Sequence, residues 1–598
     1  MPHVVTQSCC SDASCVYACP VNCIHPTPDE PDFLTAEMLH IDPAACVDCG
    51  ACVSACPVDA IVPHSKLEQS QQVFLSINAD FYKEARPRPT LAPVIAAAAV
   101  SRDREPLRVA IVGSGPAAMY AADELLTQPG AAVNVFDRLP VPHGLVRAGV
   151  APDHQKTKQV ARLYDTMAAQ SGFEYYLGVE VGKHVTHDDL LAHHHAVIYA
   201  VGASSDRKLD VPGADLPGTA SATEFVAWYN GHPDHAHHDF DLSHERAVIV
   251  GNGNVALDVA RILTADPDRL AGTDIARPAL EALRSSRIQE VVLVARRGVA
   301  QSAFTVPEFA SLLATADADV LVDPAELALD AATARLADDG ALPHAVEQKL
   351  KLIDSLRTRA TGVQVAPQAP LGARRRITLR YLQSPTRILG GPPGTTPERS
   401  RGTVTGVELV RNSLTVGANG QVRVEPTEDL ELLDTGLVLT SIGYRGVPID
   451  GVPFDEKAGV FPNADGRVLD GVGGTVLPGT YATGWIKRGP SGFIGTNKSC
   501  AQQTVHALVE DFNAGRLREP RSAAPALAAL IRSRQPAVID RAGWQSIDRA
   551  ERERGAAGAR VREKIIDPAE LAEIAAAARR EADARRKDSR TLLRSRRR

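Results

Sequence analysis

The chain has 598 residues, enough for roughly three or four domains with sizeable cores. Its 44% hydrophobic and 23% charged residues are those of an ordinary globular protein, and its net charge of −7 argues against nucleic acid as a partner. The sequence shows neither a secretory signal nor an apolar run near the ~20 residues that span a bilayer, so we expect a cytoplasmic protein with no membrane partner.

Cysteines dominate the first part of the chain. Nine of the ten lie between Cys9 and Cys56, and in a reducing compartment such clustered thiols are expected to bind metal rather than to form disulfides. Residues 46–57 read C-x2-C-x2-C-x3-C-P, the spacing of bacterial iron–sulfur ligands. Zinc is the main alternative, but its four-thiolate sites use two separated C-x2-C pairs. We therefore expect a 4Fe-4S cluster on Cys46, Cys49 and Cys52.

Residues 9–20 are a degraded copy of this run, with Asp12 where the second cysteine would stand. In two-cluster proteins the fourth cysteine of one run binds the other cluster. Cys19 is then the fourth ligand of the 4Fe-4S site, and Cys56 joins Cys9 and Cys15 at the other site. That second iron–sulfur cluster is either a three-iron cluster on those three thiolates or a four-iron cluster that Asp12 completes.

Two further cysteines stand outside this scheme. Cys10 could replace its neighbour Cys9 as a ligand. Cys23 has no place in either arrangement and is expected to be a buried free thiol. The metal ligands expected from the sequence are therefore Cys9, Cys15, Cys19, Cys46, Cys49, Cys52 and Cys56.

Beyond a Pro- and Ala-rich segment at 86–105, which we expect to be a linker, β-branched runs alternate with helical patterns, as is typical of parallel α/β layers. The first run leads into Gly113 and Gly115 of a G-x-G-x-x-A loop, where the backbone and a helix N-terminus can approach a pyrophosphate. Asp137 ends the next strand, 24 residues after Gly113. A carboxylate there suits a dinucleotide with an unmodified ribose, such as FAD or NAD.

A second fingerprint of the same spacing begins at Gly251 and Gly253. The strand after it ends in Arg296 and Arg297 instead of an acid. Guanidinium groups bind a 2′-phosphate through charge-assisted hydrogen bonds, whereas a carboxylate repels it. The second unit is therefore expected to bind NADP(H), and the two units together imply FAD and NADPH on one chain.

The motifs also carry a family resemblance. Residues 1–85 resemble the bacterial two-cluster ferredoxins, particularly the seven-iron type, and residues 106–565 resemble adrenodoxin reductase-type ferredoxin–NADP reductases. The whole chain resembles the fused ferredoxin/ferredoxin–NADP reductases. The reductase motifs that carry this likeness are GLVR at 144–147, APDH at 151–154, residues 251–258, RRG at 296–298, Phe304-Thr305 and GWIKRGP at 484–490.

The resemblance implies a set of site residues. His154 matches an active-site histidine of the family, while the acid usual three residues after the Glu308 position is Ser311 here, which puts a His–carboxylate proton relay in question. FAD contacts are expected from Gly113, Gly115, Ala117, Asp137, Leu145, Val181, Trp485, Gly492, Phe493 and Ile494. NADP contacts are expected from Gly251, Asn252, Gly253, Asn254, Val255, Arg296, Arg297 and Glu308, with Gly492 beside the flavin.

The expected fold is α/β, with two Rossmann-like dinucleotide-binding domains, the FAD domain split by the NADP domain, plus a small α+β ferredoxin-like iron–sulfur domain. The expected boundaries are a ferredoxin domain at 1–85, the linker at 86–105, an FAD domain at 106–205 and 434–565, an NADP domain at 206–433, and a helical basic tail at 566–598.

The expected activity is hydride transfer between NADPH and FAD, followed by single-electron transfer through the clusters to a redox protein, such as a haem monooxygenase or an iron–sulfur enzyme. We expect the chain to be a monomer. Cys500 is the one cysteine outside the head, which argues against the dithiol–disulfide reductases. Two other classes remain open: a subunit that works only inside a larger electron-transfer complex, and a redox sensor that binds the cofactors without turnover.

Overall fold

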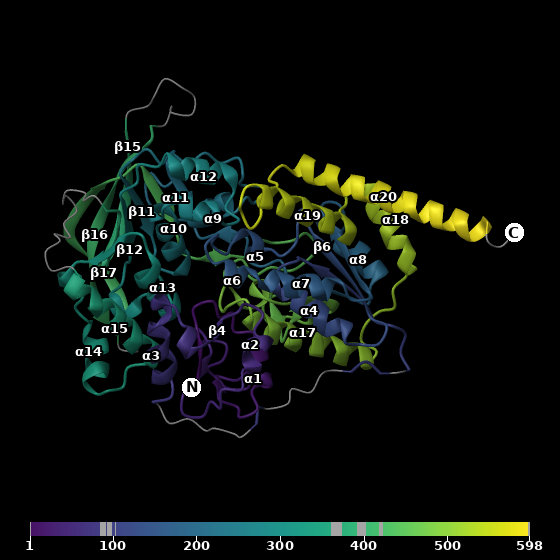
Figure 1. Cartoon of the computed structure of the whole chain (residues 1–598), viewed down its shortest axis with the longest axis horizontal. Coiled ribbons are helices and arrows are strands. Elements are labelled where there is room, and N and C mark those ends of the chain that lie inside the picture. Colours follow the sequence, from purple (N-terminus) through teal and green to yellow (C-terminus); the bar gives the residue numbers. More distant parts are fainter. Residues whose placement is uncertain are drawn as a thin grey trace.

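The computed structural model describes residues 2–83, 91–92, 99–101, 103–359, 374–391, 402–417 and 422–595. Two large β-sheet units carry a small head, residues 2–83, docked against both. In Figure 1 the purple head lies between the teal unit on the left and the blue and green unit on the right. The linker expected at 86–105 falls largely outside the described residues.

The head is a duplicated unit of short elements. Strand β1 of the first half pairs antiparallel with β4 of the second half, and β2 pairs with β3. Each half has a helix preceded by a left-handed residue, Ala13 at φ 61° and Gly50 at φ 76°. This equivalence agrees with the duplicated cysteine spacing. The elements are β1 (His3–Val5), α1 (Ser14–Ala18), β2 (Ile24–His25), β3 (His40–Ile41), α2 (Ala51–Ala55), β4 (Ile61–Pro63), η1 (His64–Lys66), η2 (Gln69–Gln71) and α3 (Val73–Asp80).

One buried amide joins the layers of the head. Asn78 on α3 accepts hydrogen bonds from the backbone N–H groups of Val5 (3.2 Å) and Ile41 (3.0 Å), and its Nδ2 donates to the Val5 carbonyl (2.8 Å). The side chain thus satisfies backbone groups of β1 and β3 that such short strands leave unpaired. Elements this short bury little apolar surface, so bound clusters are expected to contribute much of the head's stability.

The first large sheet has seven strands in the order β20-β21-β22-β8-β5-β6-β7. Strand β22 follows β8 by more than 270 residues, yet the two pair in parallel, with Thr480 opposite Val197. The split first domain expected from the sequence is therefore confirmed. The strands are β5 (Arg108–Val112), β6 (Ala132–Asp137), β7 (Phe173–Leu177), β8 (Ala196–Tyr199), β20 (Asn463–Ala464), β21 (Arg467–Leu469) and β22 (Val476–Ala482).

Helices cover this sheet, with α4 and α17 packed against each other near its centre. Apolar residues of both helices, such as Ala118, Leu125 and Leu508, are fully buried in the same core. The helices of this unit are α4 (Pro116–Leu126), α5 (Leu145–Ala148), α6 (Gln155–Lys158), α7 (Val160–Ala168), α8 (His187–His193), α16 (Trp485–Arg488) and α17 (Thr496–Asn513).

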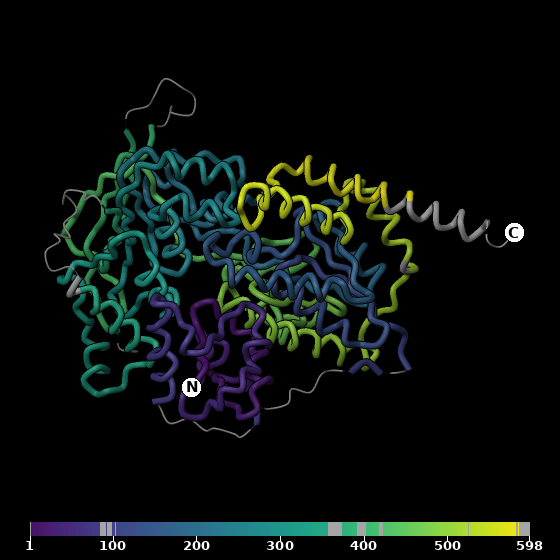
Figure 2. Tube along the Cα trace, in the orientation of Figure 1, coloured from purple at the N-terminus to yellow at the C-terminus, as the bar shows by residue number. Residues whose placement is uncertain are grey.

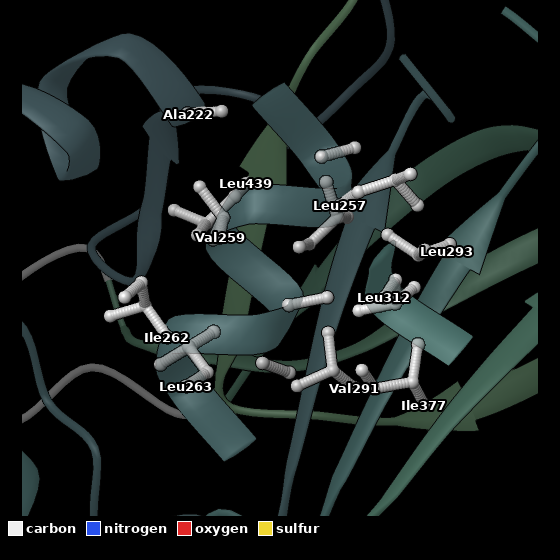
Figure 3. Close-up of a cluster of buried hydrophobic side chains, with 14 of the residues drawn as sticks. Ala222, Leu257, Val259, Ile262, Leu263, Val291, Leu293, Leu312, Ile377 and Leu439 are labelled. Carbon is white, nitrogen blue, oxygen red and sulfur yellow. The ribbon is translucent and has the colours of Figure 1, made fainter. Parts of the chain in front are cut away.

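The second sheet is parallel, in the order β10-β18-β11-β12-β14-β13. Its core, drawn in Figure 3, is formed by buried helix residues such as Leu257 together with the strand residues Val291 and Leu293. Strands buried on both faces read as continuous apolar runs, which is why this sheet is visible in the sequence. The strands are β10 (Thr219–Ser221), β11 (Arg246–Val250), β12 (Glu290–Val294), β13 (Asp319–Val322), β14 (Arg376–Arg380) and β18 (Leu437–Thr440).

The boundary expected at residue 434 lies one strand too early. Strand β18 pairs with β11, with Val438 opposite Val248, so the chain leaves the second sheet only after Thr440. A short apolar run carries no sign of which of two parallel sheets it will join, because the choice depends on a partner 190 residues away. The helices of this unit are α9 (Ala222–Tyr229), α10 (Asn254–Thr264), α11 (Pro267–Ala271), α12 (Arg277–Arg284), η3 (Val299–Gln301), α13 (Val306–Thr315), η4 (Pro324–Glu326), α14 (Ala331–Asp338) and α15 (His344–Arg359).

Two smaller sheets complete the reductase part. An antiparallel sheet of β15 (Gln383–Gly390), β16 (Val404–Val416) and β17 (Val422–Asp434) packs Val407 and Leu409 onto the second sheet. Strands β9 (Ser205–Asp206) and β19 (Tyr444–Arg445) pair where the chain passes between the two units.

The C-terminal part forms α18 (Ala524–Arg534), α19 (Arg541–Ala557) and α20 (Pro568–Ser595). The first turns of α20 pack onto the first unit, where Leu571 and Ala575 are buried. The expected basic tail is therefore attached to the core at its beginning. In the described part of the chain, none of the helices combines the length and the apolar character that crossing a membrane requires.

Candidate functional site

The first glycine loop forms a close-fitting cradle. Gly113 has φ +104°, and a Cβ atom there would lie 2.4 Å from the carbonyl oxygen of Ala200. Gly144 has φ +49°, and a Cβ atom there would lie 3.0 Å from the Cα of Gly115, so glycine is also required at 144, where its loop meets the first loop. No side chain caps the N-terminus of α4. Its N-terminal N–H groups and the open backbone of the loop fit a pyrophosphate, and FAD binding by these residues stays a prediction.

Asp137 lies beside this loop at the end of β6. Its Oδ2 accepts hydrogen bonds from the backbone N–H of Ser114 (2.9 Å) and from the Ser114 hydroxyl (2.5 Å). Burial raises the pKa of the Asp137 carboxyl, and the two bonds from Ser114 oppose that rise. The carboxylate is thus held at the end of the strand, where a ribose hydroxyl of a bound dinucleotide is expected.

A loop from the far end of the chain is packed against the first loop. Gly484 has φ +74°, and a Cβ atom there would lie 2.6 Å from the Cβ of Ala117. The next residue, Trp485, stacks on Tyr444 with ring centroids 5.6 Å apart, and its indole N–H donates to the Ser491 carbonyl (3.0 Å). The structure therefore brings Trp485 together with the first glycine loop, although more than 360 residues separate them.

The remaining residues expected at FAD differ in their placement. Gly492 has φ +79°, and the carbonyl of Phe493 accepts a hydrogen bond from the Thr496 hydroxyl (2.8 Å), which fixes the turn into α17. Leu145 begins α5 and is 45% exposed. Val181 lies in a turn beyond β7, where it pairs with Val185.

The second glycine loop is built in the same way as the first. A Cβ atom at Gly251 would lie 2.1 Å from the Ser441 carbonyl oxygen, whereas one at Gly253 would meet nothing within 4 Å. Asn254 accepts a hydrogen bond from the Thr305 backbone N–H (2.8 Å), and Asn252 accepts one from Ala303 (3.3 Å). The loop is therefore tied to the segment before α13. Val255, the next residue of α10, packs against the core.

Arg296 and Arg297 follow β12 and are exposed. Their backbone is fixed, because the Arg296 carbonyl accepts from Asn412 Nδ2 (3.0 Å) and the Arg297 carbonyl accepts from the Leu382 N–H (3.1 Å). Neither guanidinium forms an ion pair with any residue in the described part of the chain. Both are thus available to bind a phosphate, and their contact with NADP stays a prediction.

His154 and Glu308 meet where the two units and the head come together. His154 Nε2 lies 4.0 Å from Glu308 Oε2, and Asp258 lies in the same group. Burial raises the pKa of Glu308, although His154 and Arg261 lower it. Ser311 lines the cavity beside His154 but has no carboxylate to offer. Glu308 supplies the carboxylate that lies within 4.0 Å of His154 Nε2.

Two contacts of this group were not found from the sequence. Arg261 is buried and forms ion pairs with Asp153 (2.6 Å) and Asp258 (2.9 Å), and the arginine holds the pKa of Asp153 below its usual range despite burial. Gln7 of the head donates to Glu308 Oε1 (3.0 Å). The Arg261–Asp153 and Gln7–Glu308 contacts join distant segments through residue types that are common on surfaces, so no spacing could reveal them.

The first group of sulfur ligands lies on the reductase side of the head. Burial raises the pKa of the Cys15 thiol, and the neighbouring Cys9, Asp12 and Cys56 raise it further. Burial also raises the pKa of Cys9 to about 11, with Cys56 and Asp12 adding to the rise. Buried thiols that disfavour ionisation in each other's presence fit a site in which a metal cluster supplies the compensating charge.

Asp12 and Cys10 differ in their surroundings. The carboxylate of Asp12 accepts hydrogen bonds from the Ser14 hydroxyl and from the Ser14 N–H (3.3 Å). Cys10 is 3% exposed and packs into the core of the first reductase unit. Within the described head, Cys9 also packs against the head's own core, which contains Cys15, whereas Cys10 is not part of that core, and this supports Cys9 as the ligand.

The second group lines a cavity at the other side of the head. The thiols expected there, Cys19, Cys46, Cys49 and Cys52, all border it. Cys23 borders it as well, and its Sγ lies 3.4 Å from that of Cys19. The expected free thiol is buried, but it belongs to the surroundings of this site as a fifth sulfur, which the ligand spacing does not indicate. The donor set fits a 4Fe-4S cluster.

The head and the flavin loop are joined directly. The backbone N–H of Gly495 donates to the Cys10 carbonyl (2.6 Å), one residue after the expected FAD contacts at 492–494. Lys498 Nζ on α17 also donates to the Ser14 hydroxyl (3.3 Å). Figure 2 shows the purple trace of the head against the green trace of this region. The arrangement therefore connects two nucleotide cradles and two thiolate groups in one molecule.

Comparisons with known proteins agree with this geometry. The pyridine nucleotide-disulphide oxidoreductase family matches residues 107–312, and the 4Fe-4S binding domain family matches residues 39–62. A probable ferredoxin/ferredoxin–NADP reductase of Mycobacterium tuberculosis is 55% identical over 589 residues, covering 97% of this chain and 96% of the relative.

Two relatives of the reductase part were also found. The mitochondrial NADPH:adrenodoxin oxidoreductase of Homo sapiens is 40% identical, covering 78% of this chain and 91% of the relative. The structure of Mycobacterium tuberculosis FprA in complex with NADPH is 42% identical and superposes with a TM-score of 0.71, covering 79% of this chain and all of FprA.

Proposed function

Because this chain belongs to the family of fused ferredoxin/ferredoxin–NADP reductases, we propose that the head and the two sheet units form one electron path from NADPH to an external redox protein. The chain is an FAD-dependent ferredoxin–NADP reductase with its own iron–sulfur domain. Each NADPH supplies two electrons as a hydride, so two one-electron acceptors are reduced and NADP⁺ and one proton are released. Bound FAD supplies the conversion from two-electron to one-electron chemistry.

The protein's own groups hold and orient these partners. The two glycine loops present N–H groups to the pyrophosphates, and Arg296 and Arg297 bind the 2′-phosphate of NADPH. Glu308 and His154 lie where the second unit meets the first, and we propose that this pair positions the nicotinamide end and exchanges protons with solvent. Trp485, on the loop packed against Ala117, keeps water from the flavin.

We further propose two clusters in the head. The four thiols around the second cavity hold a 4Fe-4S cluster, and the first site holds a cluster on Cys9, Cys15 and Cys56, with Asp12 facing its fourth position. The external partner is a protein that accepts single electrons, such as a haem monooxygenase or an iron–sulfur enzyme.

The observation that carries this proposal is the contact between Gly495 and Cys10, because it joins the expected flavin loop to a cysteine-bearing loop. The test is anaerobic mixing of the purified chain with NADPH. We expect the flavin absorbance to bleach first and EPR signals of reduced clusters to follow, with one FAD per chain. NADPH oxidation by ferricyanide in the isolated chain separates this function from that of a complex-bound subunit or a sensor, which would give no turnover.

A further inference from the structure

The two thiolate groups of the head differ in their distance from the reductase core. Cys10 is buried in the same core as Ala117 and Tyr120 of α4, and Cys9 and Cys56 pack against its edge. The first group therefore adjoins the helix whose N-terminus carries the FAD cradle. In the described chain, none of the four thiols expected at the second site belongs to this core.

The second group lies toward solvent. Cys49 is exposed, and its neighbour Val47 is 59% exposed. Both residues line the second cavity, so a cluster bound there lies just beneath the protein surface. In the first group Cys15 is buried and Cys9 and Cys56 are partly buried, so none of its expected ligands is exposed as Cys49 is.

Gly495 controls how closely the first group approaches the flavin loop. A Cβ atom at this position would lie 2.1 Å from the backbone nitrogen of Asp12 and 2.3 Å from the carbonyl carbon of Ser11. Backbone atoms cannot give way as the end of a flexible side chain can. Any larger residue at 495 must therefore separate the head from the loop or distort both.

We infer that the first site accepts electrons from the flavin, that the second site delivers them to the external partner, and that Gly495 is the positioning residue that sets the first distance. This inference rests on the proposed function. In each pass along the chain, one electron moves from the reduced flavin to the first site, then to the second site and then to the acceptor. Two such passes consume the two electrons of one NADPH. Because electron tunnelling weakens steeply with distance, the close backbone contact at Gly495 favours this order.

Contacts with the second unit hold the head on the reductase but do not set the distance between the flavin loop and the first site. Glu37 of the head accepts a hydrogen bond from the Val306 N–H (2.6 Å) and forms an ion pair with Lys349 (2.9 Å). Val306 and Ala310 of α13 pack into the head's own core. The head is thus attached to the second unit through α13 and to the first unit through Gly495, so a change at 495 is expected to shift the head while it remains docked.

The first experiment compares Gly495→Ala with Gly272→Ala. Gly272 is exposed, has ordinary backbone angles and has open space around its Cβ position, so its alanine variant should behave like the parent chain. Both variants are mixed anaerobically with NADPH. The reduction of the flavin is followed by absorbance, and the reduction of the clusters is followed by freeze-quench EPR. For Gly495→Ala, cluster reduction relative to flavin bleaching should slow several-fold, because the tunnelling rate falls steeply as the distance between the flavin and the first site grows.

Iron content, FAD content and the EPR spectra of the dithionite-reduced clusters should stay those of the parent, which shows that Gly495→Ala is folded and loaded. If a loaded variant reduced its clusters at the parental rate, the assigned role of Gly495 would be wrong. If the parent itself failed to reduce its clusters with NADPH, the proposed function would fail instead, so the two failures are distinguishable.

The second experiment tests the order of the sites by removing one ligand from each. Cys49→Ser should impair the second cluster while NADPH still reduces the first, and reduction of cytochrome c should fall. Cys15→Ser should leave a second cluster that dithionite reduces but NADPH reduces slowly. Rapid reduction of the second cluster by NADPH in Cys15→Ser, observed by its EPR signal, would overturn the order.

Discussion

The amide of Gly495 donates a hydrogen bond to the carbonyl of Cys10 over 2.6 Å, across the boundary between the reductase and the head. This contact fixes the position of the head relative to the reductase, two parts that the sequence presents as separate domains. Gly495 follows the expected flavin contacts directly, and Cys10 follows the cysteine that the structure favours as a ligand of the first site. Electron transfer between the parts therefore depends on a packed interface and not on the linker alone.

Replacement of Arg296 and Arg297 by glutamine is expected to raise the KM for NADPH and to leave that for NADH nearly unchanged. Each charge-assisted hydrogen bond to the 2′-phosphate contributes about 1.5–3 kcal/mol, which corresponds to about tenfold or more in affinity. Steady-state rates of ferricyanide reduction with both nucleotides measure the effect.

Arg284→Gln is the matched control for this prediction. Arg284 lies on α12 of the same unit, is exposed and pairs with the exposed Asp268 (3.1 Å). Its loss should change neither KM. An equal rise for NADH and NADPH in the double variant would contradict the assignment of the second loop to NADP.

Iron analysis is expected to find two clusters and no stoichiometric zinc in protein prepared anaerobically. About seven iron atoms per chain would assign three irons to the first site, and about eight would assign a four-iron cluster with Asp12 as its ligand. Asp12→Cys should shift the first site toward a stable four-iron cluster, visible as the loss of any three-iron EPR signal. Fewer than about four irons per chain would be incompatible with two clusters.

Local motifs allowed much of the fold and the site to be predicted. The two glycine loops, the arginines after β12 and the ligand spacing depend on residues close in sequence. The structure forms each loop at the start of a helix and gathers four of the expected thiols around one cavity, while the roles of these residues in binding cofactors stay predictions. The position of β18 and the contacts of Gln7 and Gly495 could not be predicted. Gln7 reaches Glu308 across 301 residues, and the need for glycine at 495 arises only when the backbone of Asp12 is packed against it.

Glu551→Gln is expected to destabilise the chain and to weaken the pH dependence of its stability. Glu551 is fully buried and binds Arg147 and Arg562 (2.7 Å), which hold the pKa of its carboxyl below the usual range despite burial. The pKa is lower in the folded state, so this carboxylate stabilises the fold above the unfolded value of about 4.3 and loses that effect as the pH falls below it. Loss of one partner of a buried pair costs about 3–5 kcal/mol.

Urea unfolding of the variant and the parent between about pH 7 and pH 3.5 measures both effects. The difference in the unfolding midpoint should be largest near pH 7 and should shrink on acidification. Asp268→Asn is the control, because Asp268 is 83% exposed and its pair with Arg284 should contribute less than about 1 kcal/mol. A midpoint difference for Glu551→Gln that grew on acidification would contradict the assigned direction of the shift.

A fragment that begins at Arg104 is expected to retain FAD and ferricyanide reduction but to reduce cytochrome c slowly, because the head that carries single electrons is missing. The linker normally keeps the head at a high effective concentration, so the separate head should restore only part of the rate. Restoration should fall with added salt, because residues 1–85 carry eleven acidic against two basic residues and meet Lys349 and Lys498 at the interface.

The same fragment carrying Gly495→Ala separates docking from electron transfer. Glu37 can still pair with Lys349 in this fragment, so the head should bind with similar affinity in a titration followed by calorimetry. It should restore less cytochrome c reduction than it does with the parent fragment, because the contact at Cys10 is displaced while the ion pair remains. If the fragment without any head reduced cytochrome c as fast as the intact chain, the head would not carry the electrons, and a docking or regulatory role would replace the relay.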